Sequence, residues 1–353
     1  MRFCLTYSRG MRPFLVEFLN TQKIQIIDDS IEGKLFVTKK VTDCKQIPYA
    51  ERIFRVLTIL KHEKETNKRE LFNGLFEALS LQAIDKYLEN DDSRKNFRIS
   101  LKTSGKWRRK IDSVKLAKSL SRVLKKHNKL AVNLRSPDFE ICVQITESFL
   151  FVGIPQGPLL SSRPYHYKNG LRSTVCDAIV HLAELAPGQV VADFTSGSGS
   201  ILVEASHAVL PGNIFCVGLD CNYDTLMTAM LNFNYCIKVD GGKSLFDTVC
   251  ANISVDLFQW DKVDRIVADL PFGNQHGDLH EIETVFFPKV YQLLRKFFSN
   301  SSNKKIAVLL IAAGHRRDFL RALTDTVIVN VTIEERPLSL GFTDAAILKI
   351  VST

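Results

Sequence analysis

Short apolar runs and longer stretches with helical spacing alternate along the second half of the chain. A helix-like segment at 171–185 comes first, and the apolar runs after it are separated by stretches in which apolar residues recur every three or four positions. Strands that alternate with helices predict a parallel, doubly wound sheet. The predicted strands cover residues 190–193, 213–220, 264–269 and 305–314, and two more follow in 327–335 and 345–352.

The first half of the chain has a different pattern. Its first sixty residues hold short strand-like runs and one helix-like segment, which is typical of a small α/β unit. After a polar stretch at 61–70, a helix is predicted from Leu71 to Leu79, and another begins at Asp112. A β-hairpin follows, because Ile141, Val143 and Ile145 alternate with other residues before a second apolar run. The helix that begins at Asp112 has an apolar stripe of Leu116, Ala117, Leu120, Val123 and Leu124.

Positive charge is concentrated in one part of the chain. The net charge is +9, yet residues 94–135 contain 15 Lys and Arg residues and one acid, so the remainder is mildly acidic. A block of one sign favours contact with the phosphates of a polyanion over a merely solvated helix face. The predicted contacts are Lys106, Arg108, Arg109 and Lys110 around Trp107, Lys115, Lys118, Arg122 and Lys125 on one helix face, and Arg163 in the following linker.

The composition argues against a secreted, membrane-spanning or metal-binding protein. The apolar run at 306–313 is too short to cross a bilayer, and the first residues lack the apolar core of a secretory signal. The eight cysteines form no C-x-x-C pair, so neither a disulfide framework nor a metal site is predicted. Reduced thiols are typical of the cytosol and nucleus. We therefore expect an intracellular protein of the nucleus, the cytoplasm or both, with no membrane partner.

The stretch VVADFTSGSGS predicts a cofactor site. A strand ends at Asp193, Gly197 and Gly199 lie in the loop behind it, and a helix follows. Ligands of open α/β sheets bind beyond the carboxyl ends of the strands, and glycines allow a sharp turn and a close approach. The next strand ends at Asp220, whose carboxylate can accept hydrogen bonds from both ribose hydroxyls. Cofactor contacts are thus expected from Asp193, Thr195, Gly197, Gly199, Asp220, Asn252 and Asp269.

The stretch IVADLPFG predicts the catalytic residues. Asp269 ends the strand at 264–269, the fourth when a third with Asn252 at its tip is counted, and this strand should adjoin the first across the cofactor cleft. Its carboxylate and the carbonyl of Leu270 would both accept hydrogen bonds from an exocyclic amine, which would free the nitrogen lone pair for methyl transfer. Pro271 fixes its own φ and disfavours helical geometry at Leu270 before it. Phe272 can stack on a base. The alternative interpretation is a strand end followed by a turn with proline, in which Phe272 is part of the core.

These residues resemble class I S-adenosylmethionine-dependent methyltransferases. More narrowly, the chain resembles the THUMP-domain RNA guanosine-N2 methyltransferases along nearly its whole length, from RGMRPFLVEFL (9–19) to SLGFTDAAILKI (339–350). The resemblance implies a ferredoxin-like unit at 1–62, an α+β THUMP module that binds RNA at 63–158, and a Rossmann-like class I methyltransferase domain at 159–353. The C-terminal motif favours the subgroup linked to U6 snRNA over the enzymes that act on tRNA.

The same resemblance implies S-adenosylmethionine as the cofactor, structured RNA as the substrate, and a small zinc-containing activator protein at the edge of the methyltransferase sheet. The family's cofactor loop usually reads Asp-Pro-x-Cys-Gly-x-Gly-Thr, whereas Phe194, Ser196 and Ser200 replace three of these residues here. The preferred interpretation is therefore methyl transfer to N2 of a guanosine in U6 snRNA or tRNA. A catalytically inactive RNA-binding scaffold is one alternative, and an N-methyltransferase for DNA adenine or protein glutamine is another.

Overall fold

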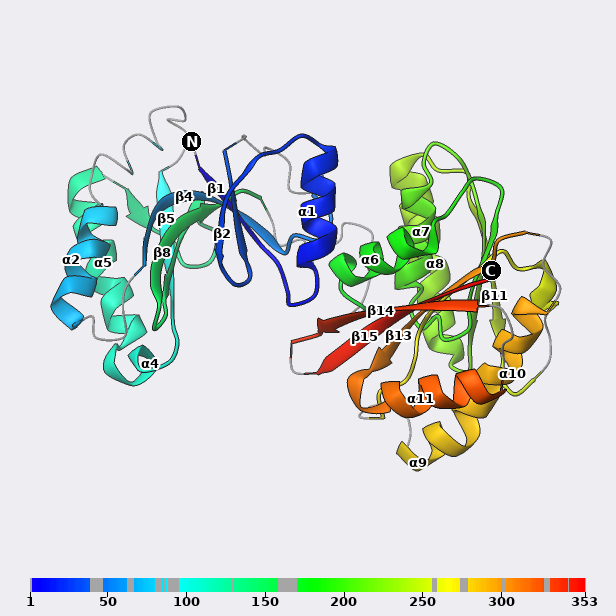
Figure 1. Ribbon diagram of the computed structural model, residues 1–353. Helices are drawn as coiled ribbons and strands as arrows, with labels where there is room; N and C mark the ends of the chain where they lie inside the picture. The colour runs from blue at the N-terminus through cyan, green and yellow to red at the C-terminus, as the bar shows by residue number, and fades with distance from the viewer. Residues whose placement is uncertain are drawn as a thin grey trace. The chain divides into compact units, whose positions relative to one another are not determined.

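The computed structural model describes most of the chain, and it divides into two compact units (Figure 1). Unit 1 comprises Met1–Thr6, Leu19–Gln46 and Arg52–Leu159, and unit 2 comprises Tyr7–Phe18, Ile47–Glu51 and Leu160–Thr353. None of the helices described in either unit is long and apolar enough to span a membrane. The described residues are 2–38, 47–61, 67–79, 84, 87, 95–128, 130–157, 170–255, 259–273, 279–299, 303–326, 331–341 and 343–352.

Unit 1 is built on an eight-stranded sheet. Its strands are β1 (Phe3–Thr6), β2 (Ile26–Ile31), β3 (Lys34–Val37), β4 (Arg52–Lys61), β5 (Asn96–Thr103), β6 (Ala131–Val132), β7 (Phe139–Ile145) and β8 (Phe149–Pro155). They lie in the order β2-β3-β1-β4-β8-β7-β5-β6. The antiparallel pair of β7 and β8 confirms the predicted hairpin. Antiparallel pairing of β4 with β8 joins the strands of the first sixty residues to those that follow.

Helices α2 (Lys68–Ala78), α4 (Trp107–Lys110) and α5 (Ser113–Asn128) also belong to unit 1. A capping box formed by Asn67 and Glu70 starts α2, so the helix begins inside the polar stretch at 61–70. In α5, Leu116, Leu120 and Leu124 are buried as predicted, because steps of four residues keep them on one line. Val123 lies at the margin of that stripe and is 41% exposed.

Unit 2 is built on a seven-stranded sheet in the order β11-β10-β9-β12-β13-β15-β14. Its strands are β9 (Val190–Asp193), β10 (Phe215–Asp220), β11 (Leu245–Cys250), β12 (Arg265–Asp269), β13 (Ile306–Ala312), β14 (Val331–Ser339) and β15 (Asp344–Ser352). Strands β9 to β13 run parallel, and β15 pairs antiparallel with both β13 and β14. The predicted α/β fold with a mostly parallel, Rossmann-like sheet is thus confirmed.

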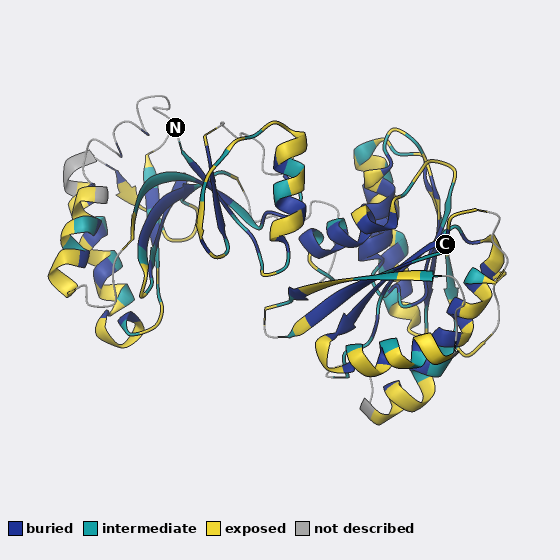
Figure 2. Ribbon diagram, in the orientation of Figure 1, coloured by how far each residue is buried: buried dark blue, intermediate teal, exposed yellow. Residues whose placement is uncertain are grey.

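Helices cover both faces of this sheet. Helices α6 (Ser173–Ala183), α7 (Ser200–Ala208) and α8 (Tyr223–Asp240) lie on one face, and α10 (Phe287–Phe298) and α11 (Ala313–Thr326) lie on the other (Figure 1). The short helix α9 (Leu279–Glu281) and a π-helix (Ile282–Phe286) lead into α10, and a 3₁₀ turn (Trp260–Lys262) precedes β12. Figure 2 shows the central strands buried and the outer sides of the helices exposed. Burial on both faces explains why β13 consists of apolar residues throughout.

Two N-terminal segments pack within unit 2. Helix α1 (Arg12–Thr21) begins there, and the carbonyl of Arg9 accepts a hydrogen bond of 3.0 Å from the amide of Ser339. The ring centroids of Phe14 and Tyr49 lie 5.5 Å apart, and both rings meet His181 of α6 edge-on. These residues therefore add an aromatic layer to α6, whereas the predicted domain boundary at residue 62 stays a prediction.

Candidate active site

Three acids lie at the carboxyl ends of adjacent parallel strands of unit 2. Asp193 ends β9, Asp220 ends β10, and Asp269 ends β12. Strand β9 pairs with β10 on one side and with β12 on the other, so the three ends meet at the same edge of the sheet. The strand of Asp269 is therefore the direct neighbour of the strand that carries the glycine loop, as the sequence predicted.

The glycine loop is fixed by hydrogen bonds to β10. The amide of Ser196 donates to the carbonyl of Leu219 at 3.0 Å, and the amide of Gly197 donates to Oδ2 of Asp220 at 2.9 Å. Gly197 and Gly199 have φ values of +49° and +77°, which residues with a side chain rarely adopt. A Cβ atom on Gly199 would lie 3.0 Å from the Cβ of Ala229 in α8. The loop thus needs both glycines, and it packs directly against α8.

Asp193 is a buried acid beside the loop. It is 2% exposed, and its Oδ1 accepts hydrogen bonds from the amide and the hydroxyl of Thr195 at 3.0 and 3.4 Å. Burial raises the pKa of Asp193 well above its ordinary value, and the nearby Asp269 and Asp220 raise it further, against the effect of the Thr195 hydrogen bonds. Thr195, predicted only as a cofactor contact, also holds Asp193 in place.

Asp269 has an unsatisfied oxygen. Its Oδ1 is buried, and no hydrogen-bond donor for it lies among the residues that the structure describes. Burial raises the pKa of Asp269 to about 7, so the carboxyl is half ionised near neutral pH. A buried carboxylate oxygen without a donor is energetically unfavourable, and such groups concentrate at functional sites. Asp269 is therefore able to accept a hydrogen bond, and a proton, from a bound ligand.

The residues after Asp269 form a turn that is anchored to the neighbouring strand β13. Leu270 is fully buried and its amide donates to the carbonyl of Leu310 at 2.9 Å, so the backbone here is anchored to β13. Pro271 and Phe272 are partly exposed, and Gly273 has a φ of +83°. Phe272 is thus a partly exposed residue, three positions after Asp269, and not one of the fully buried core residues.

Asn252 lies beyond the end of β11, on the far side of β10 from the glycine loop. Its side chain is exposed, and its Oδ1 accepts a hydrogen bond from the amide of Ser254 at 2.9 Å. This contact orders the turn after β11. The predicted contact between Asn252 and the cofactor stays a prediction.

The sequence analysis did not single out Asn232. This residue of α8 is 1% exposed, and its Nδ2 donates to the carbonyl of Ser198 in the glycine loop at 2.9 Å. The sequence does contain a sign of this role. Asn232 is a polar residue on the same helix face as Ala229, Phe233 and Cys236, all of which are buried. A polar residue on a buried helix face has a specific partner in most proteins.

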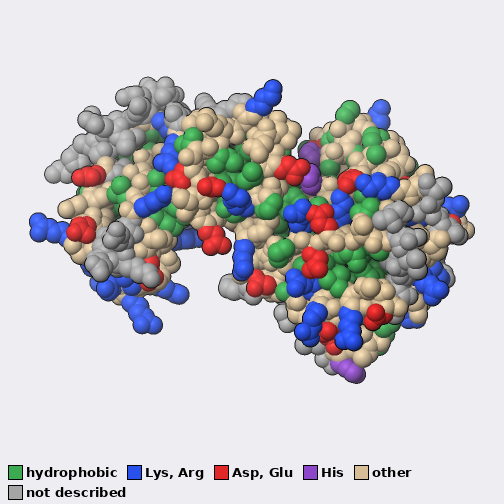
Figure 3. Space-filling view, viewed as in Figure 1, with side chains coloured by type: hydrophobic (Ala, Val, Ile, Leu, Met, Phe, Trp, Pro, Cys, Tyr) green, Lys and Arg blue, Asp and Glu red, His purple; other side chains and the backbone are tan. Residues whose placement is uncertain are grey.

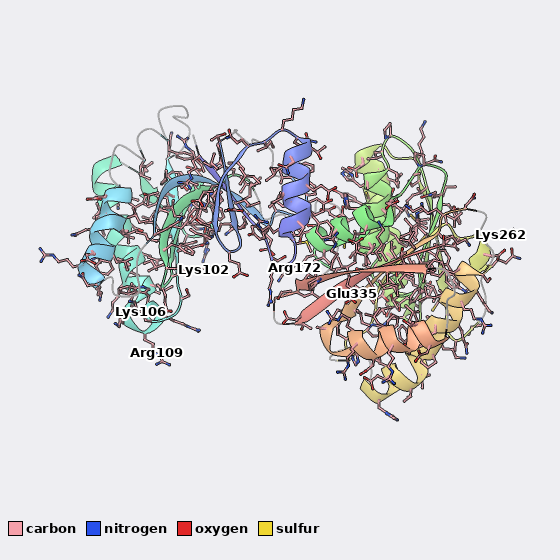
Figure 4. The ribbon with its side chains drawn as sticks, viewed as in Figure 1. Lys102, Lys106, Arg109, Arg172, Lys262 and Glu335 are labelled. Carbon is pink, nitrogen blue, oxygen red and sulfur yellow. The ribbon has the colours of Figure 1, made fainter. Side chains whose placement is uncertain are left out.

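All the predicted phosphate contacts except Arg163 lie in unit 1, on or beside α4 and α5, where Lys and Arg side chains gather (Figure 3). Figure 4 shows Lys106 and Arg109 extending outward from this part of the chain. Trp107 is 1% exposed and packs in the core, with Nζ of Lys106 5.1 Å from its ring centroid, so the indole anchors the basic segment and does not face a base. Arg163 lies outside the described residues. The exposed basic residues are Arg108, Arg109, Lys110, Lys115, Lys118, Arg122 and Lys125.

Comparison with known protein families decides the class of unit 2. Residues 161–342, just over half of the chain, match the model of the family UPF0020, described as an RMKL-like methyltransferase domain. The chain belongs to this family. The match covers the glycine loop, the three acids and the segment with Pro271 and Phe272. Unit 2 is therefore a methyltransferase domain of the family that the sequence resemblance indicated.

Similar proteins of known name agree with this assignment. U6 snRNA (guanine-N(2))-methyltransferase THUMPD2 of Bos taurus is 26% identical over 262 residues, which is 72% of this chain and 50% of that protein. tRNA (guanine(10)-N2)-dimethyltransferase of Methanocaldococcus jannaschii is 28% identical over 189 residues, 50% of this chain and 52% of that protein. The chain thus spans about half the length of both relatives.

The fold has a counterpart among solved structures. The structure of SMU.472 complexed with SAH has a TM-score of 0.75 and 14% identity, and the match covers 99% of this chain and 97% of that chain. At this identity the similarity concerns the fold alone. It extends over both units, so unit 1 and unit 2 each have an equivalent in that structure.

Proposed function

We propose that this protein transfers a methyl group from S-adenosylmethionine to the exocyclic N2 of a guanosine in a structured RNA. The single observation that carries the proposal is the buried Oδ1 of Asp269, which has no donor within the described part of the chain, at the tip of the strand beside the glycine loop. The relatives named as guanine-N2 methyltransferases of U6 snRNA and tRNA support this choice of substrate. Since snRNA is nuclear, the U6 relative also supports a nuclear location.

The residues at the strand tips fit S-adenosylmethionine. Gly197 lets a ligand approach the backbone closely, because no described atom beyond its chain neighbours lies within 4 Å of the place where its Cβ would stand, and α7 begins directly behind Gly199. Oδ1 of Asp220 accepts a hydrogen bond from the amide of Asn222, and Oδ2 accepts one from Gly197, which orients this carboxylate at the tip of β10 for ribose hydroxyls. The acids suit a cofactor with a cationic end, and S-adenosylmethionine supplies a methyl group already activated on a sulfonium.

Asp269 and Leu270 would then act on the acceptor amine. The carboxylate of Asp269 accepts a hydrogen bond from one N–H, and the carbonyl of Leu270 accepts the other, so the nitrogen lone pair is less delocalised into the ring. Phe272 stacks on the base and holds its plane. With a pKa of about 7, Asp269 is basic enough to take the proton that the amine loses.

The basic residues of unit 1 would hold the RNA. Arg108, Arg109 and Lys110 on α4, and Lys115, Lys118, Arg122 and Lys125 on α5, are exposed and carry charge of one sign, which favours phosphate contacts without base readout. Base selection would then reside at Asp269 and Phe272. Because a paired guanosine hides its amino group, the target has to be unpaired or extruded from its helix.

The test of this proposal is methyl transfer itself. The protein is incubated with isotope-labelled S-adenosylmethionine and, separately, with U6 snRNA, tRNA, double-stranded DNA and a glutamine-containing protein substrate, each followed by mass spectrometry. We expect labelled N2-methylguanosine in RNA and no label in adenine or glutamine. Label in DNA adenine or protein glutamine would support the alternative enzymes. Absence of cofactor binding by calorimetry, with the activator present, would support the RNA-binding scaffold.

Removal of charge from α5 is expected to weaken RNA binding. Replacement of Lys118, Arg122 and Lys125 by Gln removes about three phosphate contacts, which should lower affinity about 100-fold at physiological salt and reduce the slope of log affinity against log salt by about three. Filter binding or fluorescence anisotropy at several salt concentrations measures both quantities.

The matched control removes the same charge from unit 2. Lys238, Lys243 and Arg317 are exposed there, and their replacement by Gln should leave the affinity and the salt slope nearly unchanged. Equal losses in the two triple variants would show that only net charge matters, which contradicts a phosphate-binding face on α5.

We also propose that the small zinc-containing activator docks at β11 and α8. Strand β11 ends the sheet of unit 2 as described, and an edge strand offers backbone groups for pairing. Beside it, α8 has five large apolar side chains four residues apart whose exposures run from 44% to 63%. These are Tyr223, Met227, Leu231, Tyr235 and Val239, and Leu245 on β11 is 63% exposed. An apolar stripe of this length supports a protein partner at this edge.

Charge on this stripe is expected to abolish the complex. With Leu231 and Tyr235 both replaced by Glu, co-expression with the activator should give no co-purification, because two charges would be buried in an apolar contact. The control is Leu134→Glu in unit 1, where Leu134 is 71% exposed and the complex should be retained. Retention of the complex in the α8 double variant would contradict this docking site.

A further inference from the structure

The glycine loop is held from two elements, the end of β10 and helix α8. Oδ2 of Asp220, the last residue of β10, accepts a hydrogen bond of 2.9 Å from the amide of Gly197. Within α8, Nδ2 of Asn232 donates to the carbonyl of Ser198 at 2.9 Å. Consecutive loop residues are thus tied down, one through its N–H to β10 and one through its C=O to α8.

The loop depends on such contacts because two of its residues are glycines. Ser198 lies between Gly197 and Gly199, which have φ values of +49° and +77°. Glycine backbones lose more conformational entropy on ordering than those of any other residue, so hydrogen bonds are needed to hold such a segment in one conformation. The peptide between Ser198 and Gly199 is held on both sides, because its N–H donates to the carbonyl of Ser196 at 2.8 Å and its C=O accepts from Asn232.

The glycine loop also packs closely against α8, which brings Asn232 within reach of the loop backbone. A Cβ atom on Gly199 would lie only 3.0 Å from the Cβ of Ala229, which is one turn before Asn232 on α8. Because the loop lies against the helix backbone, the amide of Asn232 reaches Ser198 while remaining 1% exposed. A side chain in such a position with no donor would leave the Ser198 carbonyl without this partner.

We propose that Asn232 is a positioning residue for the cofactor, because it holds the glycine loop in the conformation that binds S-adenosylmethionine. The inference rests on the proposed function, since it concerns the same cofactor site. Asn232 acts through the loop backbone and not on the acceptor base. Its loss should therefore affect the affinity for the cofactor and leave the rate at saturating cofactor nearly unchanged.

The test uses Asn232→Asp, which keeps the shape of the side chain and removes the amide donor. The Kd for S-adenosylmethionine at pH 8.5, measured by calorimetry, should rise about tenfold relative to wild type, as expected for loss of one buried hydrogen bond. KM for the cofactor should rise equally, and kcat should stay within about twofold. At pH 6 the defect should shrink, because a protonated aspartic acid is again a donor.

Two further variants distinguish a positioning role of Asn232 from a general loss of folding. Asn232→Leu has no donor at any pH, so its defect should be the same at pH 6 and pH 8.5. Asn234→Asp makes the same chemical change at an exposed position of α8, two residues away, and should bind like wild type. Thermal melting without cofactor shows whether each variant is folded.

The outcomes distinguish this inference from the proposed function. If wild type binds S-adenosylmethionine and Asn232→Asp binds it equally well at pH 8.5, the positioning role is wrong while the methyltransferase proposal stands. A fall in kcat with unchanged KM would also overturn it. If wild type does not bind the cofactor even with the activator present, the proposed function itself fails.

Discussion

Asp269→Asn is expected to abolish methyl transfer, with a fall in kcat of about 1,000-fold at saturating cofactor, while the affinity for RNA changes little. The substitution keeps the shape of the side chain, but the amide is a far weaker proton acceptor, and general bases contribute 10²- to 10⁴-fold to rate. Single-turnover kinetics with saturating labelled cofactor measures the chemical step directly. The RNA affinity should persist because the basic residues lie in unit 1.

Asp318→Asn is the matched control for this variant. Asp318 lies on α11 with its side chain 72% exposed, so the same chemical change should leave kcat within about twofold of wild type. If Asp269→Asn retains wild-type turnover, the role proposed for this carboxylate is wrong. A loss of RNA binding in the same variant would show that the fold of the site, and not its chemistry, had been changed.

The positions of the acids could be predicted from the sequence because they depend on backbone topology. Apolar runs that end at Asp193, Asp220 and Asp269 were enough to place each acid at a strand tip, and the rule that ligands bind beyond the carboxyl ends of parallel strands brought the tips together. The neighbouring positions of β9 and β12 confirm that step. Strand ends are therefore the most predictable part of this site.

Side-chain contacts across the fold could not be predicted in the same way. The hydrogen bond between Asn232 and Ser198 joins residues 34 positions apart, and periodicity alone does not show which buried amide meets which loop carbonyl. Trp107 lies among the predicted phosphate contacts, but nothing in the sequence indicated that its side chain would be buried, at 1% exposure, in the core of unit 1. Local pattern also gave no sign that residues 7–18 pack with unit 2. Each of these features depends on tertiary packing.

The same aspartate should also lower the stability of the free protein at alkaline pH. Burial raises the pKa of Asp269 from an ordinary value of 3.8 to about 7, so between these values the folded state holds a proton that the unfolded state has lost. The free energy of unfolding therefore falls as pH rises through this range, by roughly 4 kcal/mol at most when Asp269 is fully ionised. Asparagine carries no charge to bury, so Asp269→Asn removes this loss.

Asp269→Asn is thus expected to be about 2–4 kcal/mol more stable than wild type at pH 8, with little difference at pH 4. Urea denaturation across this pH range measures the difference, and Asp318→Asn should show no pH-dependent gain. The ionised Asp269 also raises the pKa of Asp193, so its removal relieves a second buried acid and acts in the same direction. If Asp269→Asn changed the free energy of unfolding by the same amount at all pH values, burial of the ionised carboxylate would not be the cause. The expected result links stability to chemistry, because the oxygen that has no donor among the described residues is the one that a bound amine would satisfy.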